Sequence, residues 1–187
     1  MKKYKIGIAL MVAVLLVSCA TQRDSVITGG EYNEGKNQTD YFVMPYGSVV
    51  LPGKWVKTRQ SEVSFQQFFE NKDSVTIAIA FSRCNQYPFN TRGTKTGFEF
   101  VKAFYEWDSN YFVERYGLER SVIEMDSIGN NYYLYRIHGA TRNGKIDNYF
   151  LLGEKNGFVS NFCVMVTDKW TESYKIDFLK KLFLHKT

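Results

Sequence analysis

Two Asn-Gly pairs, Asn143-Gly144 and Asn156-Gly157, constrain the fold of this chain more than any other feature of its sequence. They separate three runs of strand-forming residues, at 131–141, 145–154 and 158–167. Asn-Gly supplies the positive φ angles of a type I′ turn, which is the strongest short-range signal of a β-hairpin. The sequence therefore predicts a three-stranded antiparallel meander, and residues 121–126 are a further candidate strand just before it.

Alternation predicts another strand in the first half of the chain. Large apolar residues at positions 75, 77, 79 and 81 alternate with small residues at 76, 78, 80 and 82. Side chains of a strand point alternately to its two faces, so one face carries only small residues and leaves room for a helix to pack closely. Residues 48–51 and 64–71 are shorter candidate strands.

Two segments have helical periodicity. In residues 97–117, Glu99, Lys102 and Glu106 lie three and four positions apart, which favours an ion-paired, solvent-exposed helix face over a catalytic cluster of acids. Thr171 is placed to cap a second helix that runs to about residue 184 and carries its lysines towards its C-terminal half.

The order of these elements resembles the PsbP-like fold. An early strand is followed by LPGKW at residues 51–55, two more strands, a central helix, the meander and a C-terminal helix with the stripe IDFLKKLF. The resemblance covers residues 41–187 and implies an α+β class, an antiparallel β-sheet meander flanked by helices in an α/β/α sandwich. Members of this superfamily do unrelated things, so the resemblance implies no function and transfers no binding residue.

The N-terminus has the anatomy of a secretory signal. Three lysines precede an apolar run of twelve residues at 6–17, too short to cross a bilayer of about 30 Å as a helix. Leu16-Val17-Ser18-Cys19 resembles the lipobox of bacterial lipoproteins, which implies cleavage before Cys19 and lipidation of its thiol. The alternative is an ordinary cysteine within a signal segment.

Three parts are therefore expected: a signal peptide at 1–18, a flexible tether at 19–40 and a single domain at 41–187. The tether is expected because residues 21–40 are rich in Gly, Asn, Thr and charge and hold few large apolar residues. Asp24-Ser25-Val26 resembles the acceptor pattern for O-glycosylation in the Bacteroidetes, with Ser25 as the modified residue. Ordinary turn chemistry is the alternative for such a short pattern.

The residues after Cys19 bear on the location of the protein. Surface-displayed lipoproteins of the Bacteroidetes carry an acidic run there, and enterobacterial inner-membrane lipoproteins carry an aspartate, whereas this chain has Ala20-Thr21-Gln22-Arg23. By resemblance, the expected location is the outer membrane, lipid-anchored and facing the periplasm.

Charge and composition exclude some partners. Removing residues 1–18 takes away three lysines and lowers the formal net charge from +5 to +2, and no block of five or six like charges remains. We therefore expect no nucleic-acid partner. Cys84 and Cys163 are an even pair in a compartment that permits disulfides, and alternation places both thiols on the same sheet face. They are expected to form either a disulfide or two buried reduced thiols.

No catalytic signature is present. His138 lies inside a predicted strand and His185 near the C-terminus, neither has a second histidine at ligand spacing, and no Cys-x-x-Cys occurs. We expect no metal and no cofactor, and an enzyme is unsupported. Tyr132, Tyr133 and Tyr135 could form an exposed binding face, but filling both sides of a covered sheet is the favoured interpretation.

The leading hypothesis is a lipid-anchored, periplasm-facing module that works by binding, as an accessory to an envelope protein complex. The second hypothesis is a binder of a small or glycan-like ligand in a pocket of the sheet. A hydrolase with unidentified residues is third.

Overall fold

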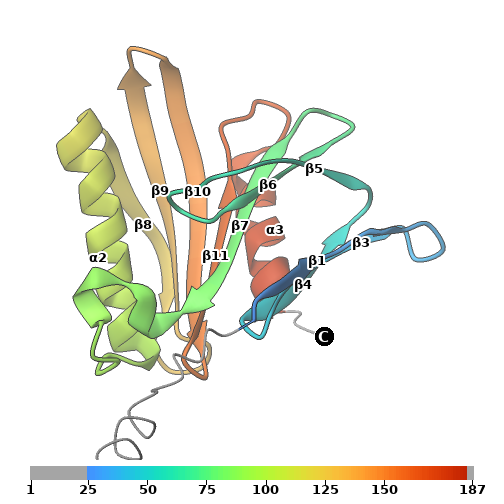
Figure 1. Cartoon of the computed structure of the whole chain (residues 1–187). Helices are drawn as coiled ribbons and strands as arrows, with labels where there is room; N and C mark the ends of the chain where they lie inside the picture. Colours follow the sequence, from blue (N-terminus) through green and yellow to red (C-terminus); the bar gives the residue numbers. More distant parts are fainter. Residues whose placement is uncertain (1–24, 185–187) are drawn as a thin grey trace, which may run out of the picture.

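The computed structural model describes residues 25–184, in which a large antiparallel sheet of seven strands forms the centre (Figure 1). The strand order across this sheet is β5-β6-β7-β11-β10-β9-β8. Its strands are β5 (Trp55–Gln60), β6 (Gln67–Asn71), β7 (Thr76–Arg83), β8 (Glu119–Asp126), β9 (Tyr132–Thr141), β10 (Gly144–Lys155) and β11 (Phe158–Val164). The predicted meander is confirmed, because β8, β9, β10 and β11 pair in chain order and antiparallel.

The predicted turn chemistry is confirmed at one Asn-Gly pair and wrong at the other. Asn156 and Gly157 connect β10 to β11 with φ angles of 55° and 81°, as a type I′ turn requires. Between β9 and β10, Thr141 pairs with Gly144, so the two turn residues are Arg142 and Asn143. Gly144 opens the next strand with a φ of 120°, a value that glycine tolerates.

A smaller antiparallel sheet of four strands precedes the large one in sequence. Its strands are β1 (Ile27–Gly29), β2 (Tyr32–Asn33), β3 (Gln38–Met44) and β4 (Gly47–Pro52). These strands correct the predicted tether at 19–40, because the part from residue 27 onward is folded. Composition missed β1 and β2 because they are edge strands, mostly exposed and held by backbone pairing with β3 instead of apolar burial.

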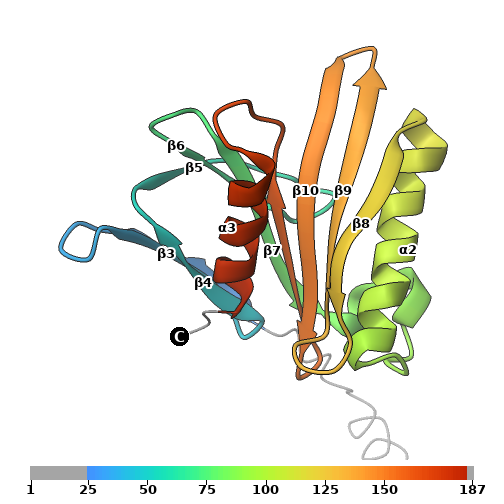
Figure 2. The ribbon, with the colours of Figure 1, turned by 180° about the vertical axis from the view of Figure 1, so that it is seen from behind.

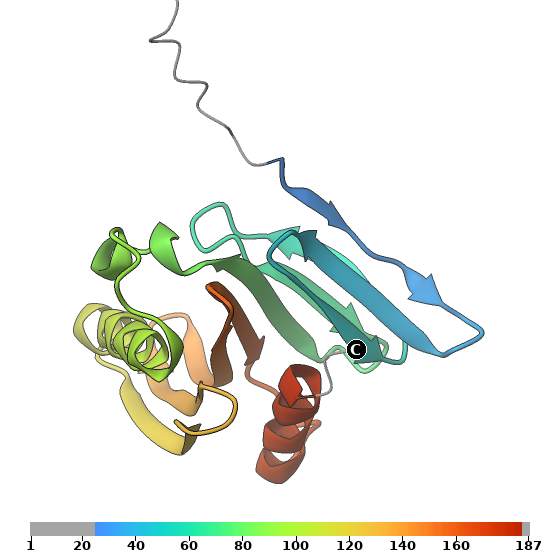
Figure 3. The same ribbon diagram turned by 90° about the horizontal axis from the view of Figure 1, so that it is seen from below.

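Helices and the small sheet cover the two faces of the large sheet (Figures 2 and 3). Helix α2 (Gly97–Tyr116) packs on β8, β9 and β10, and the short 3₁₀ turns η1 (Cys84–Gln86) and η2 (Pro88–Asn90) lead into it. On the other face, α3 (Glu172–Leu184) packs on β10 and β11, and β4 of the small sheet contacts β7 and β11. The α+β class is thus confirmed. Neither helix within residues 25–184 is long and apolar enough to cross a bilayer.

Alternating side chains of the large sheet form two separate apolar cores. On β9, Tyr132 and Leu134 belong to the core beneath α3 and the small sheet, whereas Tyr133 and Tyr135 belong to the core beneath α2. The three tyrosines are 4%, 6% and 0% exposed. This confirms that they fill both sides of a covered sheet.

Cys84 and Cys163 are buried free thiols in the core beneath α2, so the prediction that they share a sheet face is confirmed. They do not form a disulfide. The strands that carry or precede them are neighbours, but Cys163 lies opposite Ala78 and Cys84 follows Ala78 by six residues. Six residues of strand span roughly 20 Å, whereas disulfide-bonded Cα atoms lie within about 7 Å of each other. Burial, with the Glu154 carboxylate nearby, raises the pKa of the Cys84 thiol to about 12.

Candidate functional site

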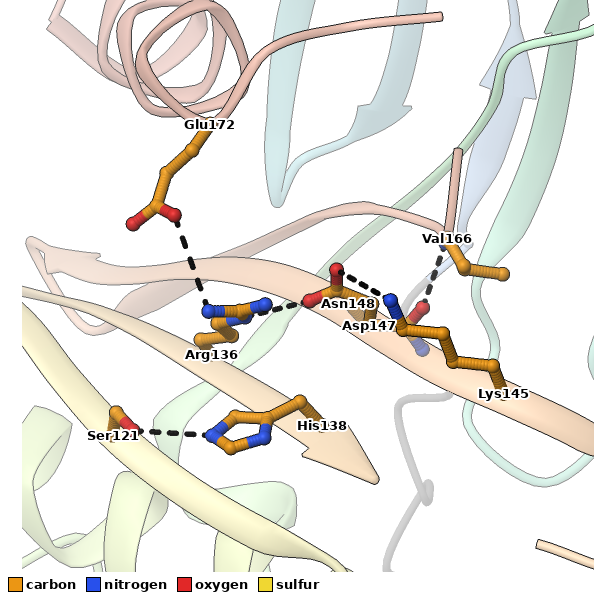
Figure 4. A network of polar contacts seen from close by, with 8 residues as sticks. All are labelled: Ser121, Arg136, His138, Lys145, Asp147, Asn148, Val166 and Glu172. Carbon is orange, nitrogen blue, oxygen red and sulfur yellow. Dashed lines mark hydrogen bonds and ion pairs between the residues drawn. The ribbon is translucent and has the colours of Figure 1, made fainter. Parts of the chain in front are cut away.

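Charged side chains from three elements gather beside the first turn of α3, on the sheet face against which α3 packs (Figure 4). The register explains why they meet: Tyr149 of β10 lies opposite Arg136 of β9, and Asp147 lies opposite His138. Alternation then puts Arg136, Asp147 and Tyr149 on the face that α3 reaches. We call the following six residues the charged cluster: Arg136, Lys145, Asp147, Tyr149, Glu172 and Lys175.

Arg136 links the β9–β10 hairpin to the start of α3. Its Nε donates to Oδ1 of Asp147 at 2.6 Å, and its Nη1 lies 3.9 Å from Oε2 of Glu172. The Nζ of Lys145 lies 4.0 Å from Oδ2 of the same Asp147, so this carboxylate contacts two cations. The aspartate and arginine side chains are only 13% and 29% exposed, and this pair is therefore better shielded from solvent than an ordinary surface ion pair.

Lys175 is 4% exposed although it is charged. Its Nζ lies 4.9 Å from the centre of the Tyr149 ring, and the guanidinium of Arg136 lies 5.3 Å from that centre. A cation over an aromatic face is attracted by the electron density of the ring, which offsets part of the lost hydration. The sequence predicts lysines towards the C-terminal half of this helix, whereas the buried Lys175 lies in its first turn.

The surroundings keep the Asp147 carboxylate ionised. Its burial works to raise its pKa, but the hydrogen bond and charge of Arg136, together with the charges of Lys175 and Lys145, outweigh that effect and lower the pKa. Burial raises the pKa of Tyr149 to about 12, although the charge of Arg136 opposes the rise. By formal charge, three cations face two carboxylates, which leaves one positive charge in excess.

Two hydrogen bonds fix the loop that brings α3 to the charged cluster. The Oδ1 of buried Asn148 accepts from the backbone N–H of Val166 at 2.9 Å, just after β11 ends. The hydroxyl oxygen of Thr171 accepts from the backbone N–H of Tyr174 at 3.3 Å, which confirms the predicted helix cap. The first turn of α3, and Glu172 with it, is thereby held in place.

His138 borders the charged cluster but lacks the partners of a catalytic base. Its Nε2 lies 3.4 Å from the hydroxyl oxygen of Ser121, and no carboxylate in residues 25–184 hydrogen-bonds the ring. An activated nucleophile needs a base that a third group orients. In the same part of the chain, no three His, Cys, Asp or Glu side chains are grouped so that they could hold a metal ion. The charged side chains of the cluster can recognise a partner by charge and hydrogen bonding.

Two surface hollows are lined by residues outside the charged cluster. One of about 510 Å³ lies between the β6–β7 turn and the loop before α3, beside Asp73 and Trp170. The other, of about 370 Å³, lies between the β8–β9 loop, the β10–β11 turn and Leu184. No residue of the charged cluster lines either hollow.

A second polar site lies beneath α2, and the sequence did not predict it. The hydroxyl of Tyr135 donates to Oδ2 of Asp108 at 2.7 Å. Although Asp108 as a residue is half-buried, its carboxyl is enclosed, and burial raises its pKa to about 6 against the lowering effect of the tyrosine hydrogen bond. Helical spacing could have found this site, because Val101, Phe104 and Asp108 recur at three and four positions on the buried face.

The residues singled out by the sequence are not brought together. Cys19 lies outside the described residues, and so does His185. Ser25 is exposed and precedes β1 by two residues, whereas Cys84 and Cys163 lie in the core beneath α2. Lys102 and Glu106 form the expected exposed ion pair at 3.9 Å, while Glu99 pairs with Lys95 at 2.8 Å.

No family model matches the chain, and no curated protein matches it. Among solved structures, the chain is similar to the solution structure of cyanobacterial PsbP (CyanoP) from Synechocystis sp. PCC 6803. The sequence identity is 9%, the TM-score is 0.47, and the match covers 89% of this chain and 95% of that chain. That neighbour is a PsbP-like protein, the class that the order of sequence elements resembled. At this identity and TM-score, the similarity carries no argument about this chain and transfers no function.

Proposed function

We propose that the protein is a lipid-anchored binding module of the bacterial cell envelope that faces the periplasm, and that the charged cluster docks an envelope protein. The observation that carries the docking proposal is the convergence of charged side chains from β9, β10 and α3 on one sheet face. Arg136, which is partly exposed, is positioned by its neighbours before any partner arrives, which reduces the entropy lost on binding. The excess positive charge favours a partner surface that carries carboxylates.

The anchor rests on the lipobox-like Leu16-Val17-Ser18-Cys19 and on the charged, apolar signal before it. Acyl chains on Cys19 would supply the membrane affinity, at about 0.8 kcal/mol for each buried methylene. The outer membrane is the proposed site, since the residues after Cys19 lack both the acidic run and the retaining aspartate.

Fatty-acid labelling in growing cells tests the anchor. We expect the wild-type chain to take up label and to sediment with membranes, and we expect Cys19→Ala to lose the label because the thiol is the acceptor. A Cys84→Ala variant is the control, since that thiol is buried and should not affect labelling. Label that persists in Cys19→Ala would show that Cys19 is not the lipidated residue.

Photocrosslinking in intact cells tests the docking site. Ala140 is exposed and lies opposite Lys145 on β9, so a photoreactive residue there reports on the neighbourhood of the charged cluster. We expect a discrete adduct with an envelope protein from position 140. The same residue at Glu114, which is exposed on α2 across the sheet, should give none.

Charge reversal makes that test specific. Lys145→Glu, on a side chain that is 73% exposed, should weaken the position-140 adduct several-fold without disturbing the fold. Lys102→Glu, on an α2 side chain that is 57% exposed and lies 3.9 Å from the Glu106 carboxylate, is the matched control and should leave the adduct unchanged. Equal adducts from positions 140 and 114, or equal effects of the two reversals, would refute docking at the charged cluster.

A further inference from the structure

Exposed apolar side chains gather at the end of the molecule where the described chain begins. We call this end the base; it consists of the start of β1, the β3–β4 turn, the β8–β9 loop and the β10–β11 turn. Figures 1 and 2 show these segments towards the lower end of the molecule, and Figure 3 looks onto it. The rings of Tyr46 and Phe158 lie 6.0 Å apart and join two of the turns, and the backbone N–H of Glu154 donates to the carbonyl of Asn131 at 3.1 Å.

The β8–β9 loop presents an isoleucine to solvent on a fixed backbone. Ile128 is 98% exposed. The Asp126 carboxylate accepts hydrogen bonds from the backbone N–H groups of Ile128, Gly129 and Asn130 at 3.0, 2.8 and 3.2 Å. These bonds lower the pKa of Asp126 to about 2, so the carboxylate remains ionised at neutral pH and the loop stays closed. The β8–β9 loop therefore contributes one large, exposed apolar side chain to the base.

The small sheet adds a second apolar spot to the base. Ile27 and Met44 are cross-strand partners, and they are 63% and 49% exposed. Val26, just before β1, is 46% exposed. Lys155, the last residue of β10, is exposed at the same end of the molecule and adds a cation to the base. Apolar side chains together with a lysine suit the boundary between lipid headgroups and acyl chains.

The number of residues between Cys19 and β1 limits the distance between the base and a lipid on Cys19. Ile27 follows Cys19 by eight positions, a length of chain that spans at most about 28 Å, and an unstructured chain of that length spans about 15 Å on average. The radius of gyration expected for a domain of 160 residues is also about 15 Å. A lipid on Cys19 would therefore keep the base, and no other end of the molecule, close to the bilayer.

We propose that the base seats on the phospholipid surface that holds the lipid of Cys19, with Ile128 and the Ile27–Met44 pair in the headgroup region. This inference rests on the lipid anchor of the proposed function and adds the orientation of the domain. The same geometry points α3 away from the bilayer, because Leu184 at its end lines the hollow next to Gly129 whereas Glu172 at its start belongs to the charged cluster.

Fluorescent probes on the full, lipidated protein in phospholipid vesicles test the seating. Ile128→Cys and Met44→Cys each receive an environment-sensitive probe, and Val63→Cys, at a 91% exposed apolar residue beyond β5, is the matched control. Cys84 and Cys163 are 5% and 2% exposed, so the unsubstituted protein should take up no probe. With quenchers attached to the acyl chains, the probes at 128 and 44 should be quenched several-fold more than the probe at 63.

The outcomes separate the seating from the anchor. Lipidated protein whose probe at 128 is quenched no more than the probe at 63 overturns the seating and leaves the anchor standing. Absence of lipid on Cys19 overturns the anchor and the seating with it. The protein is also measured at fewer molecules per vesicle. If quenching of the probe at 128 decreases on this dilution, a second copy of the protein covers the base, which also overturns the seating.

Discussion

At residue 108, a carboxyl group lies between α2 and the large sheet, where water cannot solvate its charge. Burial raises its pKa from the usual 3.8 to about 6, although the hydroxyl of Tyr135 stabilises the ionised form. Between pH 3.8 and about 6 the folded protein keeps the proton of Asp108, whereas the unfolded chain has lost it. The stability contributed by protonated Asp108 is therefore full below about pH 4 and falls as the pH rises to about 6. The difference corresponds to on the order of 3 kcal/mol.

We therefore expect Asp108→Asn to be more stable than the wild type at pH 7. The amide cannot ionise, yet its oxygen can still accept the hydrogen bond of Tyr135. Chemical denaturation at pH 4, 5, 6 and 7 measures the effect. The wild type should lose up to roughly 3 kcal/mol across this range relative to the variant, and the two should converge at the acid end.

Tyr135→Phe is the companion variant for this measurement. It removes the hydrogen bond that lowers the pKa of Asp108, so the loss of stability should extend to higher pH than in the wild type. Parallel profiles for the wild type and Asp108→Asn would show that Asp108 does not titrate in this window.

At the scale of elements, the strands of the small sheet are the main difference between expectation and structure. The pairing of β1 with β3 predicts that the backbone amides of Ile27–Gly29 exchange with solvent more slowly than in an unstructured peptide. Hydrogen exchange read by mass spectrometry or NMR measures this. The amides of β11, a central strand of the large sheet, provide the slow reference. If the amides of residues 27–29 exchanged at the unprotected rate, β1 would not be formed in solution and the prediction of a flexible tether up to residue 40 would hold.

Local signals explain which elements the sequence could predict. The meander was predictable because alternation and the Asn156-Gly157 turn act within a few residues, and the cap of α3 was predictable from Thr171 alone. The strand β1 was not, because its stability comes from backbone pairing with residues thirteen or more positions away. For the same reason the sequence could not decide whether Cys84 and Cys163 form a disulfide. Alternation shows which face of the sheet each thiol is on, but the strand register that separates the two residues cannot be read from the sequence.

The charged cluster was beyond sequence reasoning for a related reason. Arg136 and Asp147 meet only because β9 and β10 pair in one particular register, and Lys175 joins them only because α3 crosses β10 at its first turn. His138 was noticed because of its residue type, yet it lies at the margin of this site. Residue type alone therefore pointed to a residue beside the charged cluster and missed Arg136, which contacts both carboxylates of the cluster.

At the scale of the whole molecule, the charged cluster and the base lie at opposite ends of α3. A helix of thirteen residues is about 20 Å long. This separation lets a partner dock at the cluster while the base remains on the bilayer. The two proposals are independent in their residues, so Lys145→Glu should leave the probe at Ile128 quenched, and a change at Ile128 should leave the adduct at position 140 intact.

The early start of the folded region has a practical consequence for anyone who prepares a soluble form of this protein. A version that begins at residue 41 would omit β1, β2 and the first half of β3, and it would leave the backbone groups of the remaining strands without partners. Unpaired strand edges are templates for self-association. Thr39, whose hydroxyl donates to Gly53 and accepts from the backbone N–H of Trp55, would be lost as well. Truncation should therefore leave residue 25 and everything after it in place.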